Sequence, residues 1–202
     1  MVSPIRVRSL RTAVAIATVA TVAFDVIPSH AGSGLLTGVV RVAGHPAKDV
    51  VVWLEIPGGP SATATQKVVL DQRNMQFVPR VVAVRVGSTV EMPNSDRLLH
   101  NVFSFRDGKV FDLGLYPVGA SKTVTFDKPG LSRIFCNIHP TMAAYVLAVD
   151  SAYFAVSDAQ GRFTIRDVSP GTVAYRAWRA GAKPATGTLV SAEGRVVEID
   201  VP

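Results

Sequence analysis

One short stretch of the chain carries three side chains that can bind a metal ion. In CNIHPTM, Cys136, His139 and Met142 follow one another at intervals of three residues. The stretch follows a predicted strand, where the backbone must curl into a loop that can direct all three side chains at one point. Thiolate and imidazole suit copper and zinc, whereas a thioether has little use as a zinc ligand. The spacing therefore predicts a copper site.

A trigonal copper site needs one more nitrogen ligand, and His100 in NSDRLLHNVFSF supplies it at a loop-to-strand junction. Two imidazoles, one thiolate and a weak axial thioether suit both Cu(I) and Cu(II), which favours electron transfer. Cys136 is the single cysteine of the chain, so no internal disulfide can form. If the chain is exported to an oxidising compartment, a free thiol there is open to oxidation, and a metal that binds its thiolate would explain why it is present.

The first 31 residues have the organisation of a secretory signal. Arg6, Arg8 and Arg11 precede an apolar run over residues 12–24, which is shorter than the roughly 20 residues that span a bilayer. We expect cleavage after Ala31, an exported, periplasmic protein and no stable membrane insertion afterwards. The alternative is an uncleaved N-terminal anchor.

The elements that must position the four ligands are strands, because period-two alternation dominates the remaining sequence. Turn signals such as RDGK, KPG and DAQG separate the alternating segments. Many short strands at this spacing predict an all-β sandwich or barrel. The expected strands cover residues 36–42, 49–56, 67–70, 81–86, 89–92, 101–105, 121–126, 131–135, 144–149, 162–166, 173–179 and 195–201.

Around the ligands, the chain resembles the cupredoxins, in particular the plastocyanin and amicyanin group. The similarity covers about residues 67–150 and depends on FVPRVVAVRVGSTVEMPNSD, on His100-Asn101 and on FCNIHPTM. It implies a Greek-key β-sandwich in which His100, Cys136 and His139 are equatorial copper ligands and Met142 is axial. It also implies that Asn101 fastens the ligand loops to each other.

The flanking segments resemble the two parts of a transthyretin-like or carboxypeptidase-regulatory-like β-sandwich. The arrangement is similar to bacterial proteins labelled methylamine utilization proteins. We therefore expect a first part of this β-domain in residues 32–62, an inserted cupredoxin domain in 66–150 and the second part in 151–202.

One position departs from the resemblance, because Ile138 stands where plastocyanin and amicyanin often have proline. Ile138 keeps its backbone N–H, and a hydrogen bond from this group to the Cys136 sulfur would favour Cu(I). We therefore expect Ile138 to tune the reduction potential.

The leading hypothesis is a type 1 copper protein that is not an enzyme and transfers single electrons between redox protein partners. After residue 31 the chain keeps 18 basic and 14 acidic side chains without a run of like charge. This favours acidic protein partners or an anionic membrane surface and gives nucleic-acid binding little support.

Other functions stay open at this point. The same ligands could carry, store or sense copper, Cys136 and His139 could serve a hydrolase as nucleophile and base, or the chain could be a structural or carbohydrate-binding β-module. Trp53 and Trp178 fit core or inter-domain packing better than a binding platform. The following residues fit either loop packing or an apolar rim around His139: Leu98, Leu99, Leu115, Tyr116, Ile138 and Pro140.

Overall fold

A computed structural model describes residues 34–56 and 68–202 of the 202-residue chain. Every regular element in these two ranges is a β-strand, so the predicted all-β class is confirmed. The described ranges contain no helix long and apolar enough to cross a membrane. The predicted signal sequence and the proposed boundaries at 62 and 66 lie outside the described residues.

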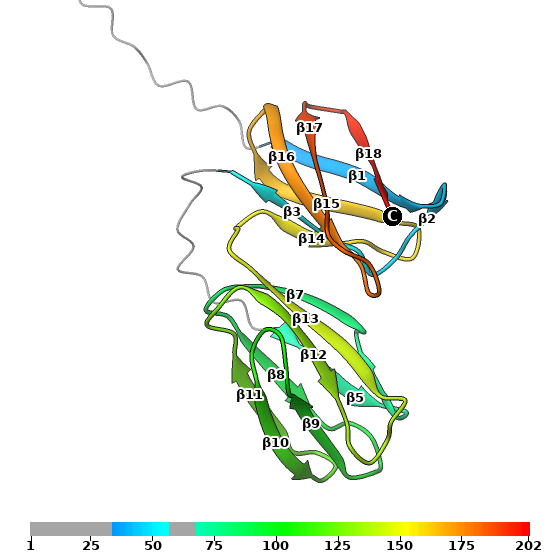
Figure 1. The fold of residues 1–202 in the computed structure, drawn as a ribbon, viewed down its shortest axis with the longest axis vertical. Helices are drawn as coiled ribbons and strands as arrows, with labels where there is room; N and C mark the ends of the chain where they lie inside the picture. Colours follow the sequence, from blue (N-terminus) through cyan, green and yellow to red (C-terminus); the bar gives the residue numbers. More distant parts are fainter. Residues whose placement is uncertain (1–33, 57–67) are drawn as a thin grey trace, which may run out of the picture. The chain divides into compact units, whose positions relative to one another are not determined.

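Two of the sheets pack face to face around one apolar core (Figure 1). In the first, β1 lies between β15 and β18 and pairs in parallel with β18, and β2 pairs with β1. The second has the order β14-β3-β16-β17 and is antiparallel throughout. The strands are β1 (Gly34–Val42), β2 (His45–Pro46), β3 (Val51–Glu55), β14 (Phe154–Val156), β15 (Arg162–Val168), β16 (Gly171–Trp178), β17 (Ala185–Ser191) and β18 (Val196–Val201).

The strands between β3 and β14 in the chain form separate sheets around a second core. A five-stranded sheet has the order β10-β9-β12-β13-β7, and a three-stranded sheet has the order β11-β8-β4. The β5–β6 hairpin completes this part. Its strands are β4 (Val68–Val69), β5 (Asp71–Arg73), β6 (Gln76–Val78), β7 (Val81–Arg85), β8 (Thr89–Pro93), β9 (His100–Ser104), β10 (Phe111–Tyr116), β11 (Ser121–Thr125), β12 (Gly130–Phe135) and β13 (Ala143–Val149).

Strand β3 is buried on both faces, which its alternating sequence alone does not indicate. Val52 and Leu54 belong to the core between the first two sheets, as their period-two spacing predicts. Val51 points to the opposite face and is also fully buried. There it packs with Trp178 in a third apolar cluster whose other members are Val81, Ala83, Leu147 and Val149.

Six strands beyond those expected from the sequence complete the sheets: β2, β5 and β6 of the hairpin, β10, β14 and β17. The β5–β6 turn places Asn74 and Met75 at positive φ, and its short strands are too polar to give an apolar alternation. Strand β10 is interrupted by a register shift between Asp112 and Leu115. Because a bulge breaks the two-residue period, the alternation is lost at this point.

Candidate metal centre

His100 is the first residue of β9 and is completely buried. The preceding loop is held by Asn94, whose side-chain amide donates to the carbonyls of Leu98 (2.8 Å) and Tyr116 (3.1 Å). The Asn94 carbonyl oxygen Oδ1 accepts from the Asp96 amide at 3.0 Å, as is typical of an Asx turn. The loop therefore delivers His100 to the core in a fixed orientation.

The other three predicted ligands lie in the turn between β12 and β13. The last register pair of these two strands is Phe135 with Ala143. The chain from Cys136 to Met142 therefore reverses direction directly after this pair. The amide of Met142 donates to the carbonyl of His139 at 2.9 Å and closes this turn. Cys136 and Met142 are buried, and His139 is half-buried.

Three ligand atoms converge on one point. The two Nδ1 atoms of His100 and His139 are 3.0 Å apart, and the Cys136 sulfur lies 3.9 Å and 3.8 Å from them. A point equidistant from these three atoms is about 2.1 Å from each, which matches the roughly 2.0–2.3 Å of metal–nitrogen and metal–thiolate bonds. Two imidazole nitrogens this close also need a cation or a shared proton between them. The donor set therefore fits a copper ion.

Met142 belongs to the same apolar cluster as Cys136. Its side chain is only 1 % exposed. Its axial role stays a prediction from the sequence.

Asp96 contacts the far side of the His100 ring, and the sequence analysis missed it. Its Oδ2 lies 3.0 Å from His100 Nε2 and accepts from the Met75 amide at 2.6 Å, while Oδ1 accepts from the Arg97 amide at 2.7 Å. The Met75 hydrogen bond lowers the pKa of Asp96 below its usual value, and the bonds to Arg97 and His100 add to this effect against the cost of burial. An ionised carboxylate here keeps the ring proton on Nε2 and leaves the Nδ1 lone pair for a metal.

Asn101 links the two ligand segments. Its Oδ1 accepts from the Asn137 amide at 3.3 Å, and its Nδ2 donates to Asp112 at 2.7 Å. The bond to Asn137 joins β9 to the residue directly after Cys136, which is the geometry that the expected fastening role requires.

The expected hydrogen bond from Ile138 to the metal site is absent. Among the hydrogen bonds of the described residues, none joins the Ile138 amide to the Cys136 sulfur. The Ile138 side chain is instead 48 % exposed. The hydrogen bond through which Ile138 was expected to tune the reduction potential is therefore not formed.

The apolar residues near the ligands divide into two groups. Tyr116 is buried and donates to the carbonyl of Met92 at 2.9 Å, so it packs in the core and is not part of a rim. The other candidates are exposed: Leu98, Leu99, Leu115, Ile138 and Pro140. We call these five residues the apolar rim.

Comparison with known proteins covers the part of the chain that holds the metal centre. Residues 64–149 match the family model of copper binding proteins, plastocyanin/azurin family. No curated protein matches the chain significantly.

Among solved structures, a purple cupredoxin from Nitrosopumilus maritimus is 22% identical, with a TM-score of 0.38, and the match covers 41% of this chain and 99% of that one. A mutant of amicyanin in its reduced form is 24% identical, with a TM-score of 0.39 and coverage of 43% and 85%. The Cu-containing nitrite reductase from Thermus scotoductus SA-01 is 25% identical, with a TM-score of 0.40, and the match covers 46% of this chain and only 25% of that one.

The family match and the metal centre fall on the same residues. His100, Cys136 and His139 all lie within 64–149, and their atoms form a group that can hold one ion. The part of the chain that matches the plastocyanin/azurin copper-binding family is therefore cupredoxin-like, and copper is its cofactor.

Proposed function

We propose that this protein is an exported type 1 copper protein that transfers single electrons between redox protein partners. The observation that carries the proposal is the convergence of two imidazole nitrogens and one thiolate at metal-bonding distance from a common point. When bound, copper supplies a one-electron couple in this site.

The residues around the site hold their positions by contacts on different strands. Asp96 orients His100, and the Asn101–Asn137 hydrogen bond ties β9 to the Cys136 turn. A site held by such contacts changes little between two oxidation states, which keeps the reorganisation energy of electron transfer small. This rigidity favours a relay over a protein that must open to release copper.

His139 offers the route to a partner. It is the single half-buried residue of the four proposed ligands, since His100, Cys136 and Met142 are each at most 4 % exposed. The apolar rim adjoins the ligands in sequence or register: Leu98 and Leu99 precede His100, Ile138 and Pro140 flank His139, and Leu115 pairs with Asn101. Exposed apolar side chains gathered at a site mark a contact surface.

A copper carrier or sensor is the second candidate, because the same four ligands would serve it. Voltammetry and chelator competition separate the two. A relay gives a reversible couple and keeps its copper in both oxidation states when a Cu(I) chelator is present. Irreversible voltammetry with loss of copper on reduction would favour the carrier.

Electron self-exchange between oxidised and reduced copies tests the route through His139. We expect Leu99→Ser to slow self-exchange without changing the reduction potential. Val196→Ser is the matched control, because Val196 is more exposed (62 %) than Leu99 (52 %) but lies on β18. Equal rates for both variants would show that the apolar rim is not the contact surface.

A further inference from the structure

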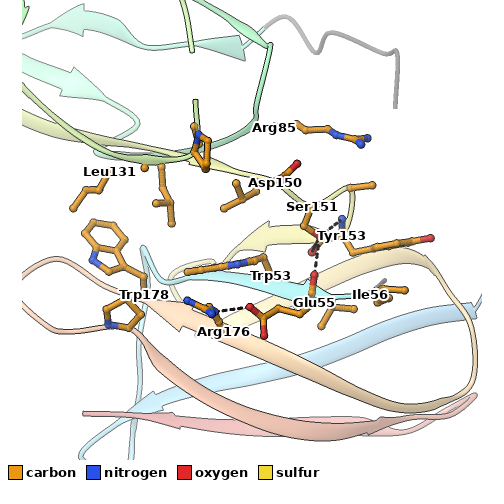
Figure 2. A pocket seen from close by; sticks show the side chains of 18 of the residues that line it. Trp53, Glu55, Ile56, Arg85, Leu131, Asp150, Ser151, Tyr153, Arg176 and Trp178 are labelled. Atoms are coloured by element: carbon orange, nitrogen blue, oxygen red, sulfur yellow. Dashed lines mark hydrogen bonds and ion pairs between the residues drawn. The ribbon is translucent and has the colours of Figure 1, made fainter. Parts of the chain in front are cut away.

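Both tryptophans of the chain line one cleft of about 1050 Å³, slightly above the roughly 300–1,000 Å³ typical of ligand pockets. Tyr153 contributes a third aromatic ring (Figure 2). Trp53 and Tyr153 are half-buried, and Trp178 is buried. The cleft lies apart from the metal centre, since none of its lining residues is a proposed copper ligand.

One face of the β3–β16 strand pair supplies much of the lining. Trp53 and Glu55 are two residues apart on β3, so they share a face. Arg176 is the register partner of Trp53, and Trp178 lies two residues further along β16. The opposite face carries Val52, Leu54 and Ala177 and belongs to the apolar core. Aromatic rings and charged planar groups therefore alternate on the Trp53 face of the pair, and the inner part of this face, at Val51 and Trp178, packs in the third apolar cluster.

Four charged side chains of the cleft form two ion pairs. Arg176 Nε donates to Glu55 Oε1 at 2.6 Å, and Arg133 Nε lies 3.4 Å from Asp107 Oδ2. The four side chains are 43–48% exposed. The Arg176 contact uses only Nε, and in the described part of the chain its two terminal amino groups make no hydrogen bond.

The charges in the cleft balance, because Arg85, Arg133 and Arg176 face Glu55, Asp107 and Asp150. A neutral ligand with many hydroxyl groups fits this lining best. Aromatic rings bind the C–H faces of sugar rings, and a guanidinium or carboxylate can bond two neighbouring hydroxyls at once. A purely apolar ligand would remove water from the ion pairs without replacing its hydrogen bonds, which costs free energy. An anionic ligand would be repelled by the three carboxylates.

We propose that this cleft binds a neutral oligosaccharide. The site is independent of the copper function, so each can fail without the other. It gives a binding role to the β3–β16 face of the flanking β-sandwich, together with lining residues of the copper-binding part such as Arg85, Leu131 and Arg133.

Intrinsic fluorescence reads this cleft directly, since both emitting tryptophans line it. Residues 32–202 loaded with copper would be titrated separately with maltohexaose, cellohexaose and chitohexaose, and with oligogalacturonate as an anionic probe. Calorimetry would confirm each saturable response. We expect at least one neutral hexasaccharide to bind, and Arg176→Gln to weaken it about tenfold through loss of charge-assisted hydrogen bonds.

Arg162→Gln is the matched control, because Arg162 forms a similar ion pair with Asp158 at 2.9 Å on β15, away from the cleft. It should bind the sugar like the unaltered chain, and both variants should keep the copper absorption. Trp53→Phe, which retains an aromatic ring for packing, should reduce affinity less than Trp53→Ala. Absence of saturable binding by all three neutral sugars, equal affinity in Arg176→Gln, or preference for oligogalacturonate would each overturn the proposal.

Discussion

Replacing Asp96 by asparagine should raise the reduction potential of the bound copper. The carboxylate lies 3.0 Å from His100 Nε2, and the imidazole ring connects it to the point where the ligand atoms converge. A negative charge here stabilises Cu(II) more than Cu(I), because the oxidised ion carries one more positive charge. Removing that charge therefore favours the reduced state.

The size of the effect follows from Coulomb's law. The distance from the Asp96 oxygen across the ring to the metal position is about 7 Å. At an effective dielectric constant of about 20, one unit of negative charge at this distance stabilises the extra positive charge of Cu(II) by about 2 kcal/mol. For a one-electron couple this is a rise of roughly 100 mV. The side chain of asparagine can still accept from Met75 and His100 through one oxygen, but it loses the bond from the Arg97 amide. We expect a loss of about 1–3 kcal/mol in the free energy of unfolding.

Protein-film voltammetry measures the potential, and chemical denaturation measures the stability. Asp158→Asn is the control, because Asp158 also accepts backbone amide hydrogen bonds, from Gln160 and Arg162, but lies outside the metal centre. An unchanged or lower potential in Asp96→Asn would refute the assigned role of the carboxylate. An equal shift in Asp158→Asn would show that the effect is not local.

Three further changes test other parts of the structure. Met142→Gln should lower the reduction potential, because an amide oxygen is a harder ligand than a thioether and favours Cu(II); a higher potential would argue against an axial Met142. Tyr116→Phe should cost about 1–3 kcal/mol, because the buried Gln72 amide loses a partner at 2.6 Å. Burial raises the pKa of Tyr116 to about 12. The stability that its neutral hydroxyl contributes is therefore complete below about pH 10, the ordinary pKa of tyrosine, and should fade as the pH rises to about 12. Absorbance titration of the two proteins would show this ionisation. Gly38→Ala should destabilise the chain by about 1–3 kcal/mol while leaving the copper spectrum unchanged, since a Cβ would stand 2.5 Å from the Phe163 ring.

The sequence was sufficient to single out His100, Cys136 and His139, whose ligand atoms the structure brings together. Cys136 and His139 lie in one loop, and His100 stands next to an apolar strand. The contribution of Asp96 could not be predicted in the same way. An aspartate four residues before a histidine is usual in solvated loops, and only the Asn94 Asx turn brings its carboxylate to the ring.

In the sheets too, the faces of single strands could be predicted from the sequence, whereas the pairing between distant strands could not. Alternation predicts that Trp53 and Glu55 share one face of their strand, and that Arg176 and Trp178 share one face of theirs. The pairing of Trp53 with Arg176, by contrast, joins residues that are far apart in the chain. Register over such a distance depends on the packing of both cores, so the cleft could not be recognised from the sequence.

The most direct test of the copper centre is the visible and electron paramagnetic resonance spectrum of residues 32–202 after addition of Cu(II), recorded beside that of Cys136→Ser. We predict an intense thiolate-to-copper absorption with one ion per chain, and its complete loss in the serine variant. A chain that binds no copper, or a spectrum that survives the loss of the sulfur, would contradict the account.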